Sequence, residues 1–213
     1  MYREFRPDQR LQRFVECGWL RSGSATPSIR VMPDGCVDVF VTAQGDVMIA
    51  GPANTFYDLP AGDQDILAGL RLRPGAAAAV IGCPANEFRD MRVPLDSAFG
   101  VAGSRIAESL LGATTPAQRV SMLADVVAEY FADTGPVVDR SVARAVAVLR
   151  AQPDRPVSAL AADIGLSERQ LRRRFEVAIG YGPKRLGRVF RFQRLLDLVH
   201  APHGRVREPG SRG

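Results

Sequence analysis

The sequence predicts an α+β protein with a strand-rich N-terminal domain, a helical connector and an all-α C-terminal domain. Three observations predict this arrangement. Short runs rich in valine and phenylalanine, separated by Pro and Gly, recur through residues 1–103. Apolar residues at three- and four-residue steps then mark helices across 104–136. Amphipathic helical stretches broken by Pro and Gly follow over 137–199, and a polar tail predicted to be disordered occupies 200–213.

The bulk composition is typical of a folded protein. Of 213 residues, 46% are hydrophobic and 24% are charged, which argues against wholesale disorder. No apolar run approaches the roughly 18 residues that a membrane helix needs, and the polar start MYREFRPDQR is unlike a secretory signal. Cys17, Cys36 and Cys83 form no CxxC pair and no even set, so we expect free, buried thiols in a cytoplasmic protein.

The charge is divided unevenly along the chain. Residues 139–213 hold 16 Lys and Arg against 7 Asp and Glu, a net charge of +9, whereas 1–138 carry a net charge of −4. A mildly acidic part joined to a strongly basic part is typical of a regulatory domain fused to a nucleic-acid-binding domain.

The first hundred residues contain three strand signals and one short helix. A Pro-Asp-Gly turn precedes a run rich in valine and phenylalanine within 30–41. Val47–Ala50 forms another short strand before Gly-Pro. The alternation of apolar and basic residues over Leu67–Arg73 predicts a half-buried strand, and residues 76–82 predict a short helix.

The connector contains two predicted helices, Arg105–Leu111 and Pro116–Phe131. Pro116 would lie in the first turn of the second helix, where proline is tolerated. Thr134-Gly135-Pro136 ends that helix and marks a domain boundary. The connector helices could pack against a second copy of the chain, giving a homodimer, or against their own sheet, and the sequence favours neither.

The basic region begins with the amphipathic helix Asp139–Ala151. A second, short helix, Ala159–Asp163, would be capped by Ser158. The residues expected to face the core of this region are Val142, Ala145, Val146, Leu149, Leu160, Ala161, Ile164 and Leu166.

A tight turn then leads to a third helix, Glu168–Val177. Gly165 permits the left-handed backbone that such a turn needs, and Ser167 caps the helix that follows. The buried side would comprise Leu171, Phe175 and Ala178, and the opposite stripe comprises Arg169, Arg172, Arg173 and Glu176. Three arginines near the start of the second helix of a helix-turn-helix suit reading of base edges in a DNA major groove. The alternative is a solvated charged face.

The segment LAADIGLSERQLRRRFEVAIG followed by GPKR resembles the first helix-turn-helix of AraC-type transcription regulators. The resemblance implies binding to double-stranded DNA, with base contacts from Arg169, Arg172 and Arg173. It also implies phosphate contacts from Gln170, Lys184 and Arg188. The helix Lys184–Val199 resembles the linker helix that joins the two helix-turn-helix units of that family.

The N-terminal part resembles the sensor domain of one branch of these regulators through MPDGCVDVFV, IAGP, GLRLRPGAA and IGCPANEFRDMRVPLDSAFG. This resemblance implies a domain able to hold a small-molecule effector. One departure is that HAPHGRVREPGSRG stands where the family has a second helix-turn-helix, so we expect a truncated, frame-altered or deliberately short form. Loss of one of two linked reading units lowers affinity by a factor of about 10² to 10⁴ unless the chain dimerises.

Two alternatives remain open. The chain could act as a dimerising partner of full-length regulators through 105–131, with little DNA binding of its own. The N-terminal domain could instead be an enzyme or a small-molecule-binding domain with an incidental basic tail. Because the only histidines are His200 and His203, a His-based metal centre or catalytic pair in that domain is excluded. We therefore expect no enzyme activity, cofactor or metal, and we interpret Asp34, Asp38, Glu87 and Asp90 as turn and surface charges.

Overall fold

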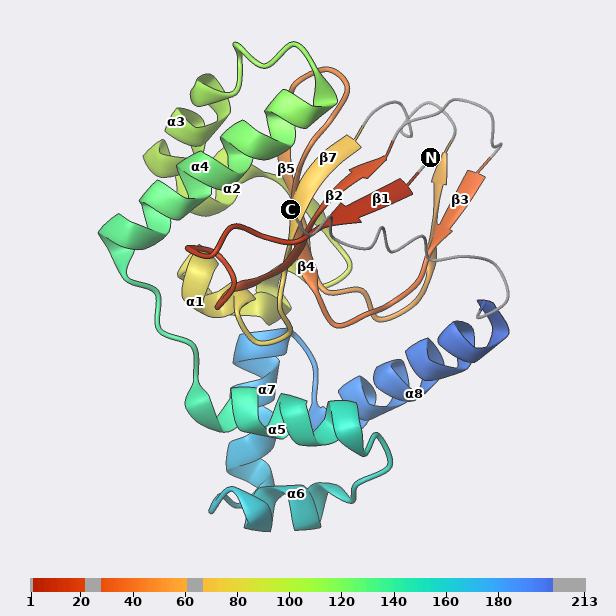
Figure 1. Ribbon diagram of the computed structural model, residues 1–213. Coiled ribbons are helices and arrows are strands. Elements are labelled where there is room, and N and C mark those ends of the chain that lie inside the picture. The colour runs from red at the N-terminus through yellow and green to blue at the C-terminus, as the bar shows by residue number, and fades with distance from the viewer. Residues whose placement is uncertain (1, 22–27, 61–66, 201–213) are drawn as a thin grey trace, which may run out of the picture.

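The computed structural model describes residues 2–21, 28–60 and 67–200, and it confirms the α+β class (Figure 1). A strand-rich half is followed by helices, as the sequence predicts. The strands are β1 (Tyr2–Phe5), β2 (Val15–Arg21), β3 (Ser28–Val31), β4 (Val37–Val41), β5 (Val47–Ala50), β6 (Tyr57–Pro60), β7 (Leu67–Leu72) and β8 (Arg92–Pro94). The helices are α1 (Ala77–Ile81), the 3-10 helix η2 (Ala85–Phe88), α2 (Leu95–Phe99), α3 (Val101–Ser109), α4 (Pro116–Thr134), α5 (Arg140–Ala151), α6 (Val157–Asp163), α7 (Glu168–Ile179) and α8 (Pro183–His200).

Six strands form one sheet in the order β1-β2-β7-β4-β5-β8, and every neighbouring pair is antiparallel. Strands β3 and β6 form a separate two-stranded sheet. The predicted strand at Val47–Ala50 is confirmed at the same residues, and β4 follows the Pro-Asp-Gly turn as expected. Strands close in sequence are therefore often not neighbours in the sheet, since β7 lies between β2 and β4.

One face of the large sheet is covered by α4, which packs on β7 and β2. Leu70, Leu72 and Val39 from the sheet share a core with Leu123 and Phe131 from this helix. Pro116 lies in the first turn of the helix, as the sequence predicts. The helix continues past its predicted end at Phe131 to Thr134, where Gly135 in a left-handed conformation ends it. Of the two arrangements that the sequence left open for the connector, the structure shows packing of α4 on its own sheet.

Strand β7 differs from the half-buried strand that the sequence predicts, because it is central and has protein on both faces. Its basic residue Arg71 consequently lies within the sheet domain, β1 to α4. The Arg71 guanidinium lies 3.1 Å from Asp38, 3.3 Å from Asp34 and 3.6 Å from Glu4. Burial alone would lower the pKa of Arg71, but Asp38 and Asp34 outweigh burial and raise that pKa. In β7, the basic residue of the alternating pattern therefore belongs to an ion-pair cluster inside the sheet domain and does not face solvent alone.

The three cysteines are free thiols, as predicted. Cys17 and Cys36 are buried, whereas Cys83 is only half-buried. Burial raises the pKa of the Cys17 thiol to about 12 and that of Cys36 well above its ordinary value. Both buried thiols are therefore protonated and act as small apolar side chains.

Helices α5 to α8 form a second, separate core, which we call the helical unit. The predicted inward residues of the first two helices are buried or, for Ile164 and Leu166, partly buried. The expectation that Ser158 caps α6 is wrong, because the helix begins two residues earlier than predicted, at Val157, with Pro156 in the N-cap position. The proline side chain has no oxygen to accept a hydrogen bond, so α6 starts without a side-chain cap. The predicted disordered tail 200–213 lies outside the described residues, apart from His200 at the end of α8.

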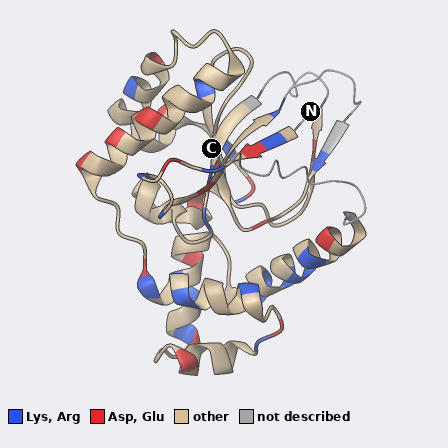
Figure 2. Ribbon diagram, viewed as in Figure 1, with Lys and Arg blue, Asp and Glu red and all other residues tan. Residues whose placement is uncertain are grey.

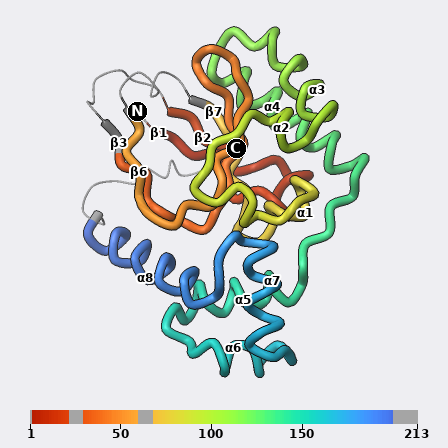
Figure 3. The backbone as a smooth tube through the Cα atoms, turned by 180° about the vertical axis from the view of Figure 1, so that it is seen from behind, coloured from red at the N-terminus to blue at the C-terminus, as the bar shows by residue number. Residues whose placement is uncertain are grey.

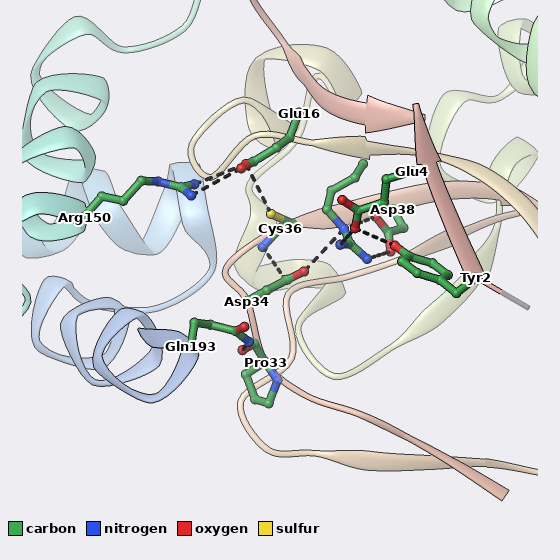
Figure 4. Close-up of polar contacts among 10 residues, drawn as sticks. Tyr2, Glu4, Glu16, Pro33, Asp34, Cys36, Asp38, Arg150 and Gln193 are labelled. Atoms are coloured by element: carbon green, nitrogen blue, oxygen red, sulfur yellow. Dashed lines mark hydrogen bonds and ion pairs between the residues drawn. The ribbon is translucent and has the colours of Figure 1, made fainter. Parts of the chain in front are cut away.

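The helical unit lies below the sheet domain (Figure 3), and polar contacts at the 33–36 turn and nearby join the two (Figure 4). Arg150 of α5 donates two hydrogen bonds to Glu16, of 3.2 and 3.1 Å. Gln193 of α8 donates to the Pro33 carbonyl at 2.6 Å. Gly35, with a φ of +85°, leaves room for no side chain, because a Cβ would lie 2.7 Å from Leu186. The 33–36 turn thus serves as a docking point for α8.

Among the described residues, no helix combines the length and the apolar character that crossing a bilayer requires.

Replacing Arg71 tests the importance of the ion-pair cluster. We expect Arg71→Met to lower the free energy of unfolding by about 2–4 kcal/mol, because it leaves Asp38 and Asp34 without their cation in a largely covered site. Arg30→Met, which breaks the exposed Arg30–Asp58 pair, should cost less than about 1 kcal/mol. Urea unfolding followed by circular dichroism measures both. Equal losses in the two variants would show that the cluster is no more important than a surface ion pair.

Candidate nucleic-acid interface

The turn between α6 and α7 has the geometry that the sequence predicts. Gly165 has a φ of +70°, and Ser167 caps α7 by accepting a hydrogen bond from the Gln170 backbone N–H at 3.2 Å. The Gln170 side chain completes the cap, because its Oε1 accepts from the Ser167 backbone N–H at 2.9 Å. Gln170, predicted as a phosphate contact, therefore has its amide oxygen committed to capping the helix. The Ser-x-x-Gln spacing was the signal for this role.

The arginine stripe lies on the exposed side of the first turns of α7, which extend away from the sheet domain (Figure 1). Leu171, Phe175 and Ala178 are buried on the opposite side, as predicted. Arg172 pairs with Glu168 at 3.3 Å, whereas Arg169 and Arg173 form no ion pair within the described part of the chain. The stripe is thus presented outward by a helix whose inner face is fixed in the core.

A groove of about 600 Å³ runs between α7 and α1. Arg169 and Arg173 line it on one side, and the small residues Gly75, Ala78 and Ala79 line it on the other. At the far end of α7, Glu176 is engaged by Arg89 of the sheet domain at 3.6 Å, and Arg89 also donates to the Gly180 carbonyl at 3.0 Å. The start of α7 is therefore open, whereas its end is held against η2 and α1.

Arg174 has a positioning role that sequence reasoning missed. It lies off the stripe and contacts Asp139 at 2.7 Å. Asp139 is the N-cap of α5, where its carboxylate accepts from the backbone N–H groups of Ser141 and Val142. The Arg174–Asp139 pair therefore ties the orientation of α7 to the start of α5. Because Arg172, Arg173 and Arg174 are consecutive in the sequence, no local pattern distinguished Arg174 from the two arginines before it.

Lys184 and Arg188, the other predicted phosphate contacts, are exposed near the start of α8. They do not line the groove between α7 and α1. Basic side chains occur along α5, α7 and α8 (Figure 2), which places much of the positive charge of the chain on the helical unit. The structure thus brings Arg169 and Arg173 together at one groove and leaves Lys184 and Arg188 as separate exposed cations.

The acidic residues considered as an alternative site have other partners. Asp34 accepts from the Cys36 backbone N–H at 2.9 Å, and burial raises the pKa of its carboxyl. Asp38 is bound by Arg71, and Asp90 accepts from the Asn54 backbone and side chain. Glu87 lies in the first turn of η2. Within the described residues, no group of three His, Cys, Asp or Glu side chains is placed to hold a metal ion.

Comparison with known proteins gives one family match, for the sheet domain. Residues 3–94, from β1 to β8, match a domain of unknown function, DUF6597. No curated protein matches the chain. Among solved structures, the crystal structure of the AraC-like transcriptional activator CuxR is similar at 16% identity and a TM-score of 0.23, covering 85% of this chain and 73% of that chain. Residues 3–94, which span strands β1 to β8 of the sheet domain, are therefore the part of the chain that is similar to DUF6597.

Proposed function

We propose that this protein binds double-stranded DNA through α6 and α7 and regulates transcription. The observation that carries the proposal is the start of α7, where a capped helix presents Arg169 and Arg173 outward without an ion-pair partner in the described chain. An α-helix fits the major groove of B-DNA, and an arginine there donates two hydrogen bonds to guanine O6 and N7. The mechanism is binding without chemistry.

The charge distribution supports the same proposal. Residues 139–213 carry a net charge of +9, and phosphate contacts give affinity that is independent of sequence and falls with salt. We assign those contacts to Lys184 and Arg188 and the base contacts to Arg169, Arg172 and Arg173. Arg172 would have to release Glu168, an exposed pair that costs little to break.

The groove beside α7 gives space for one DNA strand. The wall opposite α7 includes the small residues Gly75, Ala78 and Ala79, which leave room for a phosphodiester backbone. Asp139 also lines the groove, and its carboxylate is paired with Arg174. In this arrangement α7 enters the major groove, and the sheet domain borders the duplex on one side.

Arg173→Ala and Lys184→Ala separate base contacts from phosphate contacts. We expect Arg173→Ala to lose about 1–3 kcal/mol of binding free energy on a preferred duplex and to relax sequence preference. Lys184→Ala should weaken binding to preferred and scrambled duplexes equally and reduce the salt dependence. Fluorescence anisotropy with DNA from upstream of the protein's own gene, at two salt concentrations, measures both.

The control is Arg144→Ala, which removes an exposed arginine of α5 outside the stripe. It should leave sequence preference unchanged. Equal losses from Arg173→Ala on matched and scrambled DNA would contradict the base-contact assignment. Absence of binding to any duplex at low salt would overturn the proposed function.

Changing Ala79 tests whether DNA occupies the groove beside α7. Ala79→Glu places a carboxylate opposite Arg169 and Arg173 without altering α7, so we expect about tenfold weaker binding to DNA, equivalent to about 1.4 kcal/mol. Ala79→Gln is the matched neutral variant and should bind nearly as well as the unaltered protein. If both variants bind equally, DNA does not approach α1.

A further inference from the structure

A second cavity, of about 280 Å³, lies between the large sheet and the β3–β6 sheet. It opens on the sheet face opposite α4. Its lining includes Trp19 from β2, Phe40 from β4 and Tyr57 from β6. This volume is slightly below the roughly 300–1,000 Å³ of pockets that hold small organic molecules. No role in DNA binding involves these residues.

The apolar wall of the cavity depends on Gly69 of β7, which pairs with both Trp19 and Phe40 in the sheet. A Cβ at this position would lie 2.7 Å from the indole ring and 2.8 Å from the Phe40 Cβ. The missing side chain lets the two rings approach to 6.2 Å between centroids. The indole Nε1–H of Trp19 is buried and has no hydrogen-bond partner among the described residues, although buried indole N–H groups usually have one.

Some charged residues in the cavity wall are paired with one another, and others have no partner of opposite charge. Arg71 and Asp38 bind one another, so that pair offers little to a ligand. Arg21 and Arg92 instead lie over aromatic rings, 5.6 Å from the Tyr2 centroid and 4.6 Å from the Tyr57 centroid, and pair with no carboxylate in the described chain. Burial lowers the pKa of Arg21, and Tyr57 is among the groups close enough to influence it. Two arginines without a carboxylate partner in the described chain, one over Tyr2 and one over Tyr57, therefore line the same cavity. The remaining carboxylate, Asp46, is exposed.

We propose that this cavity binds a small carboxylic acid with an apolar body. The carboxylate is held by Arg21 and Arg92, since arginine binds carboxylates through paired N–H donors. The apolar body lies against Trp19 and Phe40, and a polar atom of the ligand accepts a hydrogen bond from the indole N–H of Trp19. This assignment goes beyond the proposed DNA binding and is independent of it.

The test uses the full chain without DNA and two probes of similar size and shape, the anion benzoate and the neutral amide benzamide. We expect isothermal titration calorimetry to show benzoate binding at least about tenfold more tightly than benzamide. Inorganic phosphate, an anion without an apolar body, should not compete. Since Trp19 is the only tryptophan in the chain, a change in its fluorescence on adding benzoate places the probe in this cavity.

The test variant is the double substitution Arg21→Gln/Arg92→Gln, and its matched control is Arg3→Gln. Arg3 lies on the neighbouring strand β1, over Phe5, and does not line the cavity. The double variant should lose benzoate binding by at least about tenfold, whereas Arg3→Gln should retain it. Benzamide binding as tightly as benzoate, no benzoate binding at millimolar concentration, or equal binding by both variants would overturn the proposal. If the double variant does not fold, the comparison of probes on the unaltered chain decides. DNA binding enters none of these measurements, so either proposal can fail without the other.

Discussion

The ion-pair cluster around Arg71 is the interaction on which the arrangement of the molecule depends. Arg71 lies on the central strand β7 and binds Asp38 of the next strand, Asp34 of the 33–36 turn and Glu4 of β1. Asp34 in turn fixes the backbone at Cys36, and the same turn receives Gln193 of α8 at the Pro33 carbonyl. The guanidinium of Arg71 therefore contacts the same turn that receives α8, and Figure 4 shows Pro33, Asp34 and Gln193 at this turn.

The same cluster separates two surfaces of different chemistry. On one side, Arg71 and Asp38 form part of the cavity wall but satisfy one another, which leaves Arg21 and Arg92 as the cations available to a ligand. On the other side, Cys36 contacts Glu16 at 3.9 Å, and Glu16 binds Arg150 of α5. Cavity and helical unit are thus joined by a continuous series of polar contacts.

The helical unit is held at one end and open at the other. Arg89 holds the end of α7 near the sheet domain, and Arg174 links α7 to the cap of α5. The start of α7 has no such contacts with the sheet domain, and its cap is completed within the chain segment itself by Ser167 and Gln170. This asymmetry leaves the arginine stripe accessible while the helix that carries it is rigidly oriented.

The sequence by itself determined the local structure, because periodicity, caps and turn residues act over a few residues. It predicted β5, the buried face of α5, the Gly165 turn, the Ser167 cap and the stripe of Arg169, Arg172 and Arg173. Only the tertiary structure decided which charges meet. Glu16 and Arg150 are 134 positions apart, and nothing in either local pattern selects that partner from the other charged residues. For the same reason the alternation in β7 was compatible with a solvent-facing Arg71. The order of the strands brings Arg71 to its carboxylates, Gly69 beneath Trp19 and α1 beside α7, since these contacts depend on where distant segments pack.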